Sequence, residues 1–301
     1  MKILILLLCF AISAFNCHAV EDLDEKNEVR VLIVDGFNNH DWEKSTEAIL
    51  SILSRDLSLI TTVSTVPQLN SEAWKSWNPD FSNYDVIIQN TNDISKKGAW
   101  PNEAKIALEE YVSNGGGLLI FHSANNAFPD WNEYNKMIGL GWRNKNAGQA
   151  IIIQDDVPVI IPVGEGSNTS HGKRVDTVIT RLGEHPIHAG LPRQWMAADL
   201  EVYRYARGPA ENISVLSYTR EHKTGLNFPV EWVIKYGMGR VYNSTFGHYW
   251  HKLSEDPPGI RCNGFQTILP RAVRWLAGLE VTSELPAEFP SKDQISLYKK
   301  H

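Results

Sequence analysis

The sequence predicts an α/β domain built on a mostly parallel sheet with helices on both faces. Residues 29–34 and 118–121 are short, nearly continuous apolar runs, which are typical of strands buried on both sides. Residues 101–114 place apolar side chains at helical spacing just before the second run. Strand and helix patterns alternate in this way through the first half of the chain, and such alternation indicates parallel βα units.

The first half divides into elements in a clear order. Residues 29–34 form the first strand, and residues 43–56 follow with apolar side chains at helical spacing. Residues 59–66 and 86–88 are the next two strands. The helix at 101–114 starts with a proline, which suits the first helical position, and a strand at 118–121 follows it.

The second half is less regular. Residues 139–174 are rich in Gly, Asn and Ser, and we expect a long, elaborated loop region with strand-like stretches at 150–153 and 159–163. A final amphipathic helix ends at Gly278, and Pro270 within it predicts a kink or a late start. Between these regions lie short strand candidates at 175–179, 200–205, 213–218, 230–234 and 240–246.

Residues 1–19 have the pattern of a secretory signal peptide. Lys2 is the basic start, residues 3–15 are apolar but too few to span a bilayer comfortably, and small residues precede a cleavage point after Ala19. We therefore expect a secreted or periplasmic protein without a membrane span. A membrane anchor and a lipidated Cys17 remain alternatives.

The mature chain is expected to be one domain. Residues 20–28 are charged and are predicted to be a disordered lead, residues 29–281 form the domain, and residues 282–301 are a C-terminal tail. The net charge of −6 gives no sign of a nucleic-acid partner. Ten Trp, ten Tyr and ten Phe fit sugar binding, because sugar C–H faces stack on rings, but they fit a large core equally well.

Histidines follow several of the predicted strands. In an open α/β sheet, ligands bind outside the carboxyl ends of the strands. His40 follows the first strand, His122 follows the strand at 118–121, and His248 follows the last strand candidate. If the strands lie as predicted, these three side chains converge. The alternative for each is a hydrogen-bonded structural histidine.

Two of these histidines are predicted to be catalytic. An imidazole has an ordinary pKa near 6.5, so His122 and His248 are suited to act as acid and base. Glu201 and Tyr203 alternate on one face of a strand candidate and could assist as base and proton donor. A structural hydrogen-bonded pair is the alternative for these two.

The remaining candidates are predicted to bind the substrate. Trp142 and Arg143 could form a stacking surface with an anion or hydroxyl clamp, and His171 in the long loop could reach the crevice. The full set of predicted substrate-binding residues is Asn39, His40, Asp41, Trp42, Ser123, Asn125, Trp142, Arg143 and His171.

Metal and cofactor signatures are absent from the sequence. There is no H-E-x-x-H or C-x-x-C spacing, so a metal would need ligands from separate loops, such as His122, Glu201 and His248. The spacing neither supports nor excludes a divalent metal. No G-x-G-x-x-G follows the first strand, no P-loop occurs, and no serine or cysteine lies in a nucleophile elbow.

An ordered series of motifs resembles the trehalose-utilisation (ThuA-like) family over residues 29–281. It includes Asn-Asn-His-Asp-Trp at 38–42 and Gly-Gly-Gly-Leu-Leu-Ile-Phe-His-Ser at 115–123. Further matches lie at 128–131, 137–140, 170–172, 184–187, 190–192, 207–212 and 237–248. Two departures concern the site: the family's Asp-Glu-x-Tyr has its first acid displaced to Asp199, and the loop at 141–144 is shortened.

This resemblance implies a flavodoxin-like fold similar to class I glutamine amidotransferases, but no glutaminase, because the nucleophilic cysteine is absent. It also implies a role in the metabolism of trehalose or 3-keto sugars. We therefore expect an exported enzyme, a hydrolase or lyase, that cleaves or rearranges a sugar derivative by acid–base chemistry. The alternatives are a non-catalytic carbohydrate-binding module and a metal-dependent sugar hydrolase. The oligomeric state is left open.

Overall fold

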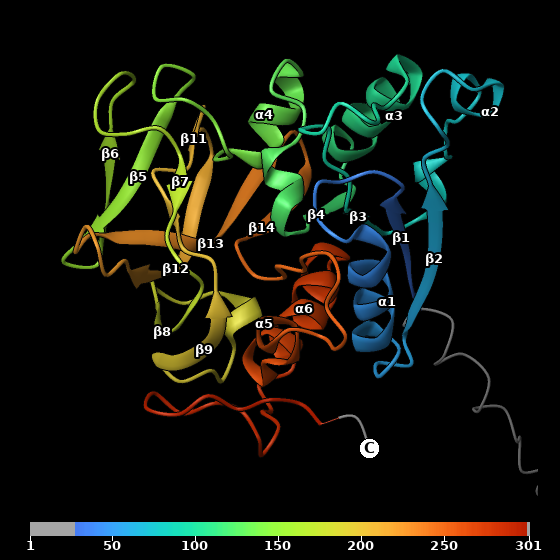
Figure 1. Cartoon of the computed structure of the whole chain (residues 1–301). Helices are drawn as coiled ribbons and strands as arrows, with labels where there is room; N and C mark the ends of the chain where they lie inside the picture. The colour runs from blue at the N-terminus through green and yellow to red at the C-terminus, as the bar shows by residue number, and fades with distance from the viewer. Residues whose placement is uncertain (1–27, 300–301) are drawn as a thin grey trace, which may run out of the picture.

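The computed structural model describes residues 28–299, and its centre is a twelve-stranded mixed sheet (Figure 1). The main strand order is β2-β1-β3-β4-β14-β13-β12-β8-β9. Five neighbouring strands at one end pair in parallel. These are β2 (Leu59–Thr65), β1 (Val29–Asp35), β3 (Val86–Gln89), β4 (Gly117–Ile120) and β14 (Gly239–Ser244).

The rest of the sheet is antiparallel. From β14 onward, each strand on the main path pairs antiparallel with the next. These strands are β13 (Asn227–Tyr236), β12 (Ile213–Arg220), β8 (Val175–Arg181) and β9 (Gln194–Leu200). The predicted α/β fold with a parallel sheet is thus confirmed, and an antiparallel half extends it from β14.

Residues 139–174, expected to be a long loop region, contain a hairpin at the two strand-like stretches. Its strands β5 (Gln149–Gln154) and β6 (Val157–Ile161) pair with each other, and β5 also touches β13. Two short pairings complete the region. The small strands involved are β11 (Arg207–Gly208), which pairs with β5, and β7 (Ser170–His171), which pairs with β10 (Tyr203–Arg204).

Helices cover both faces of the parallel half (Figure 1). One face carries α1 (Trp42–Leu53), α5 (Pro258–Arg261) and α6 (Asn263–Leu276), and the other carries α3 (Asn102–Ser113) and α4 (Asn132–Ile138). The short elements are α2 (Glu72–Lys75), η1 (Phe81–Asn83), η2 (His122–Asn126) and η3 (Pro186–His188). The last helix, α6, starts at Asn263 and continues through Pro270, so the predicted alternative of a late start was wrong.

The presence of a core on both faces of the sheet explains why the first strands are continuous apolar runs. Side chains alternate across a strand, and in β1 Val31 and Ile33 enter the core on the α1 and α6 face. Leu32 and Val34 enter the core on the α3 and α4 face. Because both faces are covered, every second position no longer needs to be polar.

The C-terminal segment packs on the domain although it has no helix. Leu285, Phe289, Ile295 and Leu297 contact the core on the α6 face, and Leu297 forms an isolated bridge with Cys262. The predicted signal peptide at 1–19 and nearly all of the expected disordered lead at 20–28 lie outside the described residues. Within 28–299, no helix has the length and apolar character needed to cross a bilayer.

Candidate metal centre

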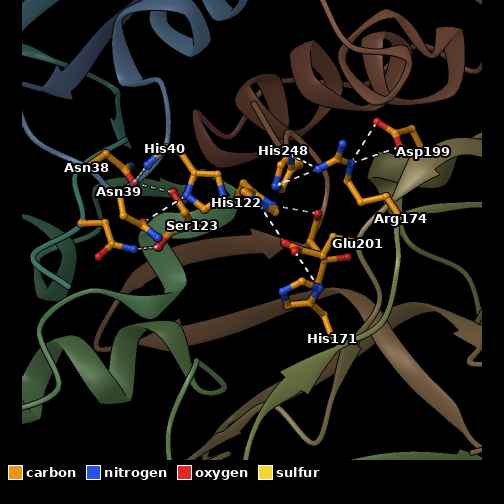
Figure 2. Close-up of polar contacts among 12 residues, drawn as sticks. Asn38, Asn39, His40, His122, Ser123, His171, Arg174, Asp199, Glu201 and His248 are labelled. Atoms are coloured by element: carbon orange, nitrogen blue, oxygen red, sulfur yellow. Dashed lines mark hydrogen bonds and ion pairs between the residues drawn. The ribbon is translucent and has the colours of Figure 1, made fainter. Parts of the chain in front are cut away.

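Four buried side chains from distant parts of the sequence meet at the carboxyl edge of the parallel strands (Figure 2). They are His40, His122, Glu201 and His248, and we refer to them as the His–Glu cluster. Each offers one potential ligand atom, and these atoms all lie within 4.8 Å of one another. The predicted convergence of the three histidines is therefore confirmed.

The fold brings these residues together through the ends of its strands. His40 follows β1, His122 follows β4 and His248 follows β14, so the three histidines come from one edge of the parallel half. Glu201 comes from the antiparallel half, in the short link between β9 and β10. His122 adopts φ +42, a strained conformation for a side chain with a Cβ, and such strain is typical of functional sites.

His122 is oriented by the main chain. Its Nδ1 lies 2.9 Å from the carbonyl oxygen of Thr245. A carbonyl only accepts, so Nδ1 carries the proton, and in the neutral imidazole the lone pair of Nε2 points into the site. Nε2 lies 3.3 Å from Oε2 of Glu201 but has no hydrogen-bond partner. A lone pair facing a carboxylate is unfavourable unless a proton or a metal ion lies between the two groups.

His40 is held in a similar way. Its Nδ1 lies 3.0 Å from Oδ1 of Asn39, and its backbone N–H donates to Oδ1 of Asn38. The Asn39 oxygen accepts from Nδ1 and leaves Nε2 as the unprotonated nitrogen. Such outer hydrogen bonds commonly fix the ring orientation and tautomer of metal-binding histidines. Burial and the charges of His122 and His248 lower the pKa of His40 far below its usual value.

His248 lies beside a guanidinium. Nη1 of Arg174 is 3.3 Å and 3.4 Å from the two ring nitrogens of His248, while its Nε contacts both carboxylate oxygens of Asp199 (Figure 2). Burial lowers the pKa of His248 to about 3, and the charges of His122 and Arg174 contribute. His248 and His40 are therefore neutral at pH 7, which is the form that binds metals.

Glu201 supplies the negative charge of the cluster. Burial tends to raise the pKa of its carboxyl, but its contacts with the neighbouring histidines, His122 first, lower the pKa below the usual value. Its second oxygen, Oε1, lies 3.0 Å from Nδ1 of His171. Glu201 is thus an ionised carboxylate between a buried histidine and a half-exposed one.

This donor set fits a divalent transition metal. Three imidazoles and one carboxylate suit zinc and its neighbours, whereas magnesium and calcium prefer oxygen ligands. In a tetrahedral site with four ligand atoms each about 2.1 Å from the ion, any two ligand atoms would be about 3.4 Å apart. The potential ligand atoms of the cluster, all within 4.8 Å of one another, would therefore move closer together on binding an ion.

The sequence model of the trehalose utilisation (ThuA) family matches residues 30–276. The chain belongs to this family. A ThuA-like protein from Parabacteroides merdae is 31% identical, with a TM-score of 0.83 over 90% of this chain and 98% of its own. Membership of this family links the chain to carbohydrate metabolism.

More distant structures are also similar. A ThuA-like protein from Bacteroides uniformis is 15% identical, with a TM-score of 0.51 over 86% of this chain and 95% of its own. A glutamine amidotransferase from Thermotoga maritima is 10% identical, with a TM-score of 0.39 over 72% of this chain and 75% of its own. A search of curated proteins found no match.

Tyr203, a predicted catalytic residue, borders the His–Glu cluster. Its ring centroid is 5.9 Å from that of His122, and its hydroxyl is buried without a hydrogen-bond partner. The side chain of Asn125 is also buried and unpaired. Buried polar groups without partners are rare and often mark places where a water or ligand binds.

Several predicted substrate-binding residues have structural contacts next to the cluster. Asp41 caps α1 by accepting from the backbone N–H of Lys44, and Trp42 begins that helix. Ser123 is buried and donates to Asn38. His40, also predicted to bind substrate, belongs to the cluster itself.

Arg143 does not have the predicted role of a substrate clamp. Its side chain is buried and donates to the carbonyl oxygens of Asn126, Ala127 and Trp142 and to Oδ1 of Asn135. Its donors are used to hold the loop after η2, so this prediction was wrong. Trp142 remains half-buried beside the site and contacts the rings of His171 and Tyr203.

Sequence reasoning missed two residues beside the cluster, Arg174 and Trp250. Arg174 lies two residues after the Ser-His-Gly motif, and Trp250 lies two residues after His248. Only their proximity to those motifs could have indicated them. The displaced acid, Asp199, reaches the site indirectly, because it pairs with Arg174.

Proposed function

We propose that this ThuA-family protein is a metal-dependent enzyme that cleaves or rearranges a sugar derivative. The observation that carries the proposal is the His–Glu cluster, in which four potential ligand atoms lie within 4.8 Å in a buried site. The sugar class follows from the family, whose sequence model is that of trehalose utilisation. The predicted acid–base roles of His122 and His248 are thereby replaced by ligand roles.

A bound divalent metal would supply Lewis acidity toward a carbonyl or hydroxyl oxygen of the sugar. The residues of the chain provide its environment. Thr245 and Asn39 fix the rings of His122 and His40, and burial keeps water from competing for the ligands. An oxidised sugar fits such a site, because its carbonyl oxygen can donate a lone pair to a Lewis acid.

His171 is the residue best placed to move a proton. It contacts Glu201, but it lies outside the cluster and its side chain is 43% exposed, so substrate can reach it. An imidazole can both accept and donate a proton. The unpaired hydroxyl of Tyr203 is a second group that could donate a hydrogen bond to a sugar oxygen.

The protein would act outside the cytoplasm. The pattern at 1–19 supports export, and a mature chain starting at Val20 is the expected product. Sequencing the N-terminus of the protein recovered from the periplasm or the culture medium tests this part of the proposal. An uncleaved N-terminus would leave the anchor alternative in place.

The first experiment measures metal content. The mature protein is stripped with a chelator, incubated with zinc, manganese or iron(II), desalted and analysed by mass spectrometry for bound metal. We expect about one ion per chain, with affinity reduced by more than about tenfold by His122→Ala or His248→Ala, because losing a ligand should cost at least as much as the roughly 10–100-fold typical of losing an outer hydrogen-bond partner. His222→Ala, which changes an exposed histidine outside the cluster, is the control.

The second experiment measures turnover. Trehalose, other disaccharides and their 3-keto derivatives are incubated with the stripped and metal-loaded protein, and products are identified by mass spectrometry. Turnover only with metal supports the proposal. Metal-independent turnover that His122→Ala abolishes would restore the acid–base hypothesis. Sugar binding without turnover would make the protein a binding module.

A further inference from the structure

One exposed aromatic side chain lies against the His–Glu cluster. Trp250 belongs to the loop between β14 and α5 and is 47% exposed. Of the ten tryptophans in the sequence, all lie within the described residues, and Trp250 is the only one in the exposed class. The other nine are buried or half-buried.

The inner side of this indole is fixed by the cluster. Its ring centroid lies 5.0 Å from that of His40, edge-on, and 6.0 Å from that of His248, with the ring planes 18° apart. His251 adds a third contact at 5.8 Å, and the Nε2 of His251 lies 3.1 Å from the carbonyl oxygen of Asn39. Trp250 is therefore a supported aromatic surface, held by neighbours that include two of the proposed metal ligands.

The exposure of the Trp250 indole lowers stability but provides a surface on which a ligand can bind. Exposed apolar surface loses the stabilisation that burial would bring, so a tryptophan is usually placed inside or given a partner. Ligand sites are lined by aromatic side chains next to a few polar groups. The cluster supplies the polar groups, and the outward part of Trp250 supplies an apolar surface beside them.

A second tryptophan lies near the site with different contacts. Trp142 is half-buried, and its ring contacts Tyr203 and His171, the residue beside Glu201. Trp250 contacts His40 and His248 instead. Trp250 thus contacts two members of the cluster directly, whereas Trp142 contacts residues beside it, and Trp250 is the more exposed of the two.

We infer that Trp250 is the platform on which a sugar ring of the substrate stacks while its polar edge reaches the His–Glu cluster. The C–H face of a pyranose is apolar and matches an exposed indole, whereas its hydroxyl or carbonyl groups project from the rim. The choice of a sugar as the occupant rests on the proposed function. Trp250 would then be a residue that determines substrate affinity and not a metal ligand.

The test compares wild type, Trp250→Ala, Trp250→Phe and Leu253→Ala in the mature, metal-loaded protein. Leu253 is an exposed apolar residue of the same loop and serves as the matched control. Trehalose, methyl α-glucoside and their 3-keto derivatives are titrated by calorimetry. We expect Trp250→Ala to weaken the binding of the preferred sugar at least tenfold, Trp250→Phe to weaken it less, and Leu253→Ala to leave it unchanged.

Three results would overturn the inference. The first is equal sugar affinity in wild type and Trp250→Ala. The second is no binding of any of these sugars to wild type. The third is self-association of wild type that Trp250→Ala abolishes without a change in sugar affinity, which would make the indole a contact between copies. Metal content measured on the same samples separates this inference from the proposed function, because sugar stacking on Trp250 without bound metal would refute only the latter.

Discussion

At the scale of single residues, the site depends on which atom of each imidazole carries the proton. The Thr245 carbonyl and the Asn39 amide oxygen assign that proton in His122 and His40. These partners are main-chain or uncharged groups, so they orient the rings without adding charge. Glu201 is the only acidic member of the cluster, and a divalent ion bound there would leave a net positive site. Such a site favours an electron-rich oxygen of the substrate.

The histidine pKa values predict how the metal-free protein responds to acid. His248 has a pKa of about 3 in the folded protein, against about 6.5 when unfolded, so below pH 6.5 the unfolded state binds a proton that the folded state does not. Stability contributed by this residue is therefore lost as pH falls from about 6.5 toward 3. At pH 5 we expect a loss of about 2 kcal/mol from His248 alone.

Urea unfolding of the chelator-treated protein at pH 7 and pH 5 measures this loss. His248→Gln removes the titrating group and should reduce the difference between the two pH values by roughly that amount. His40 shifts in the same direction, so part of the acid sensitivity should remain in this variant. Equal pH dependence in wild type and His248→Gln would show that His248 does not resist protonation.

At the scale of elements, the end of β14 shows how the backbone aims a ligand. Gly247 precedes His248 and has φ +99, a conformation that residues with a Cβ rarely adopt. A Cβ on Gly247 would also lie 2.5 Å from the ring of Phe121, the residue before His122. The chain can turn His248 into the site because no side chain is present at this position.

Gly247→Ala should therefore damage both stability and metal binding. The left-handed conformation and the steric overlap together should cost more than 2 kcal/mol of unfolding free energy and displace His248. Gly278→Ala is the matched control, because Gly278 has φ +80 and no atom within 4 Å of its Cβ position. The control should lose about 1 kcal/mol and keep its metal affinity. Wild-type metal affinity in Gly247→Ala would contradict this account.

The elements also show what the sequence could and could not predict. Continuous apolar runs such as 29–34 identify parallel strands, and the rule that sites lie at the carboxyl ends of such strands predicts from the sequence alone that His40, His122 and His248 converge. The pairing of β12, β13 and β8 was not predictable, since short strands carry no signal for their neighbours. The burial of the Arg143 side chain depends on the path of the loop after η2, which the sequence pattern does not show. The position of Trp250 beside the site was not predictable either, because it lies in a loop without periodicity.

At the scale of the whole molecule, a second buried polar network joins the two halves of the sheet. Glu231 on β13 is fully buried and accepts from Ser217 Oγ at 2.5 Å and Tyr242 OH at 2.7 Å, and it lies 3.1 Å from Nε2 of His188. Burial tends to raise the pKa of Glu231, but the charge of His188 and these hydrogen bonds lower it overall. The network connects β12, β13, β14 and η3.

Glu231→Gln should destabilise the fold without affecting the metal centre. Removing one partner of a buried charged network commonly costs about 3 kcal/mol or more, because the remaining polar groups stay buried. Urea unfolding should detect this loss, while bound metal stays at the wild-type ratio. Glu184→Gln breaks an ion pair whose acid is 86% exposed and should change stability by less than about 1 kcal/mol. Loss of metal in Glu231→Gln would mean that the network shapes the cluster.

The potential metal ligands come from both halves of the sheet, and this affects how unfolding would change the metal centre. The three histidines are anchored in the parallel half, whereas Glu201 arrives from the antiparallel half. If the antiparallel half opened first, the ion would keep its nitrogen ligands and exchange a carboxylate for water. Its visible spectrum, with cobalt as the bound ion, would then change before the helices unfold. The metal would report the separation of the two halves as a distinct, earlier transition.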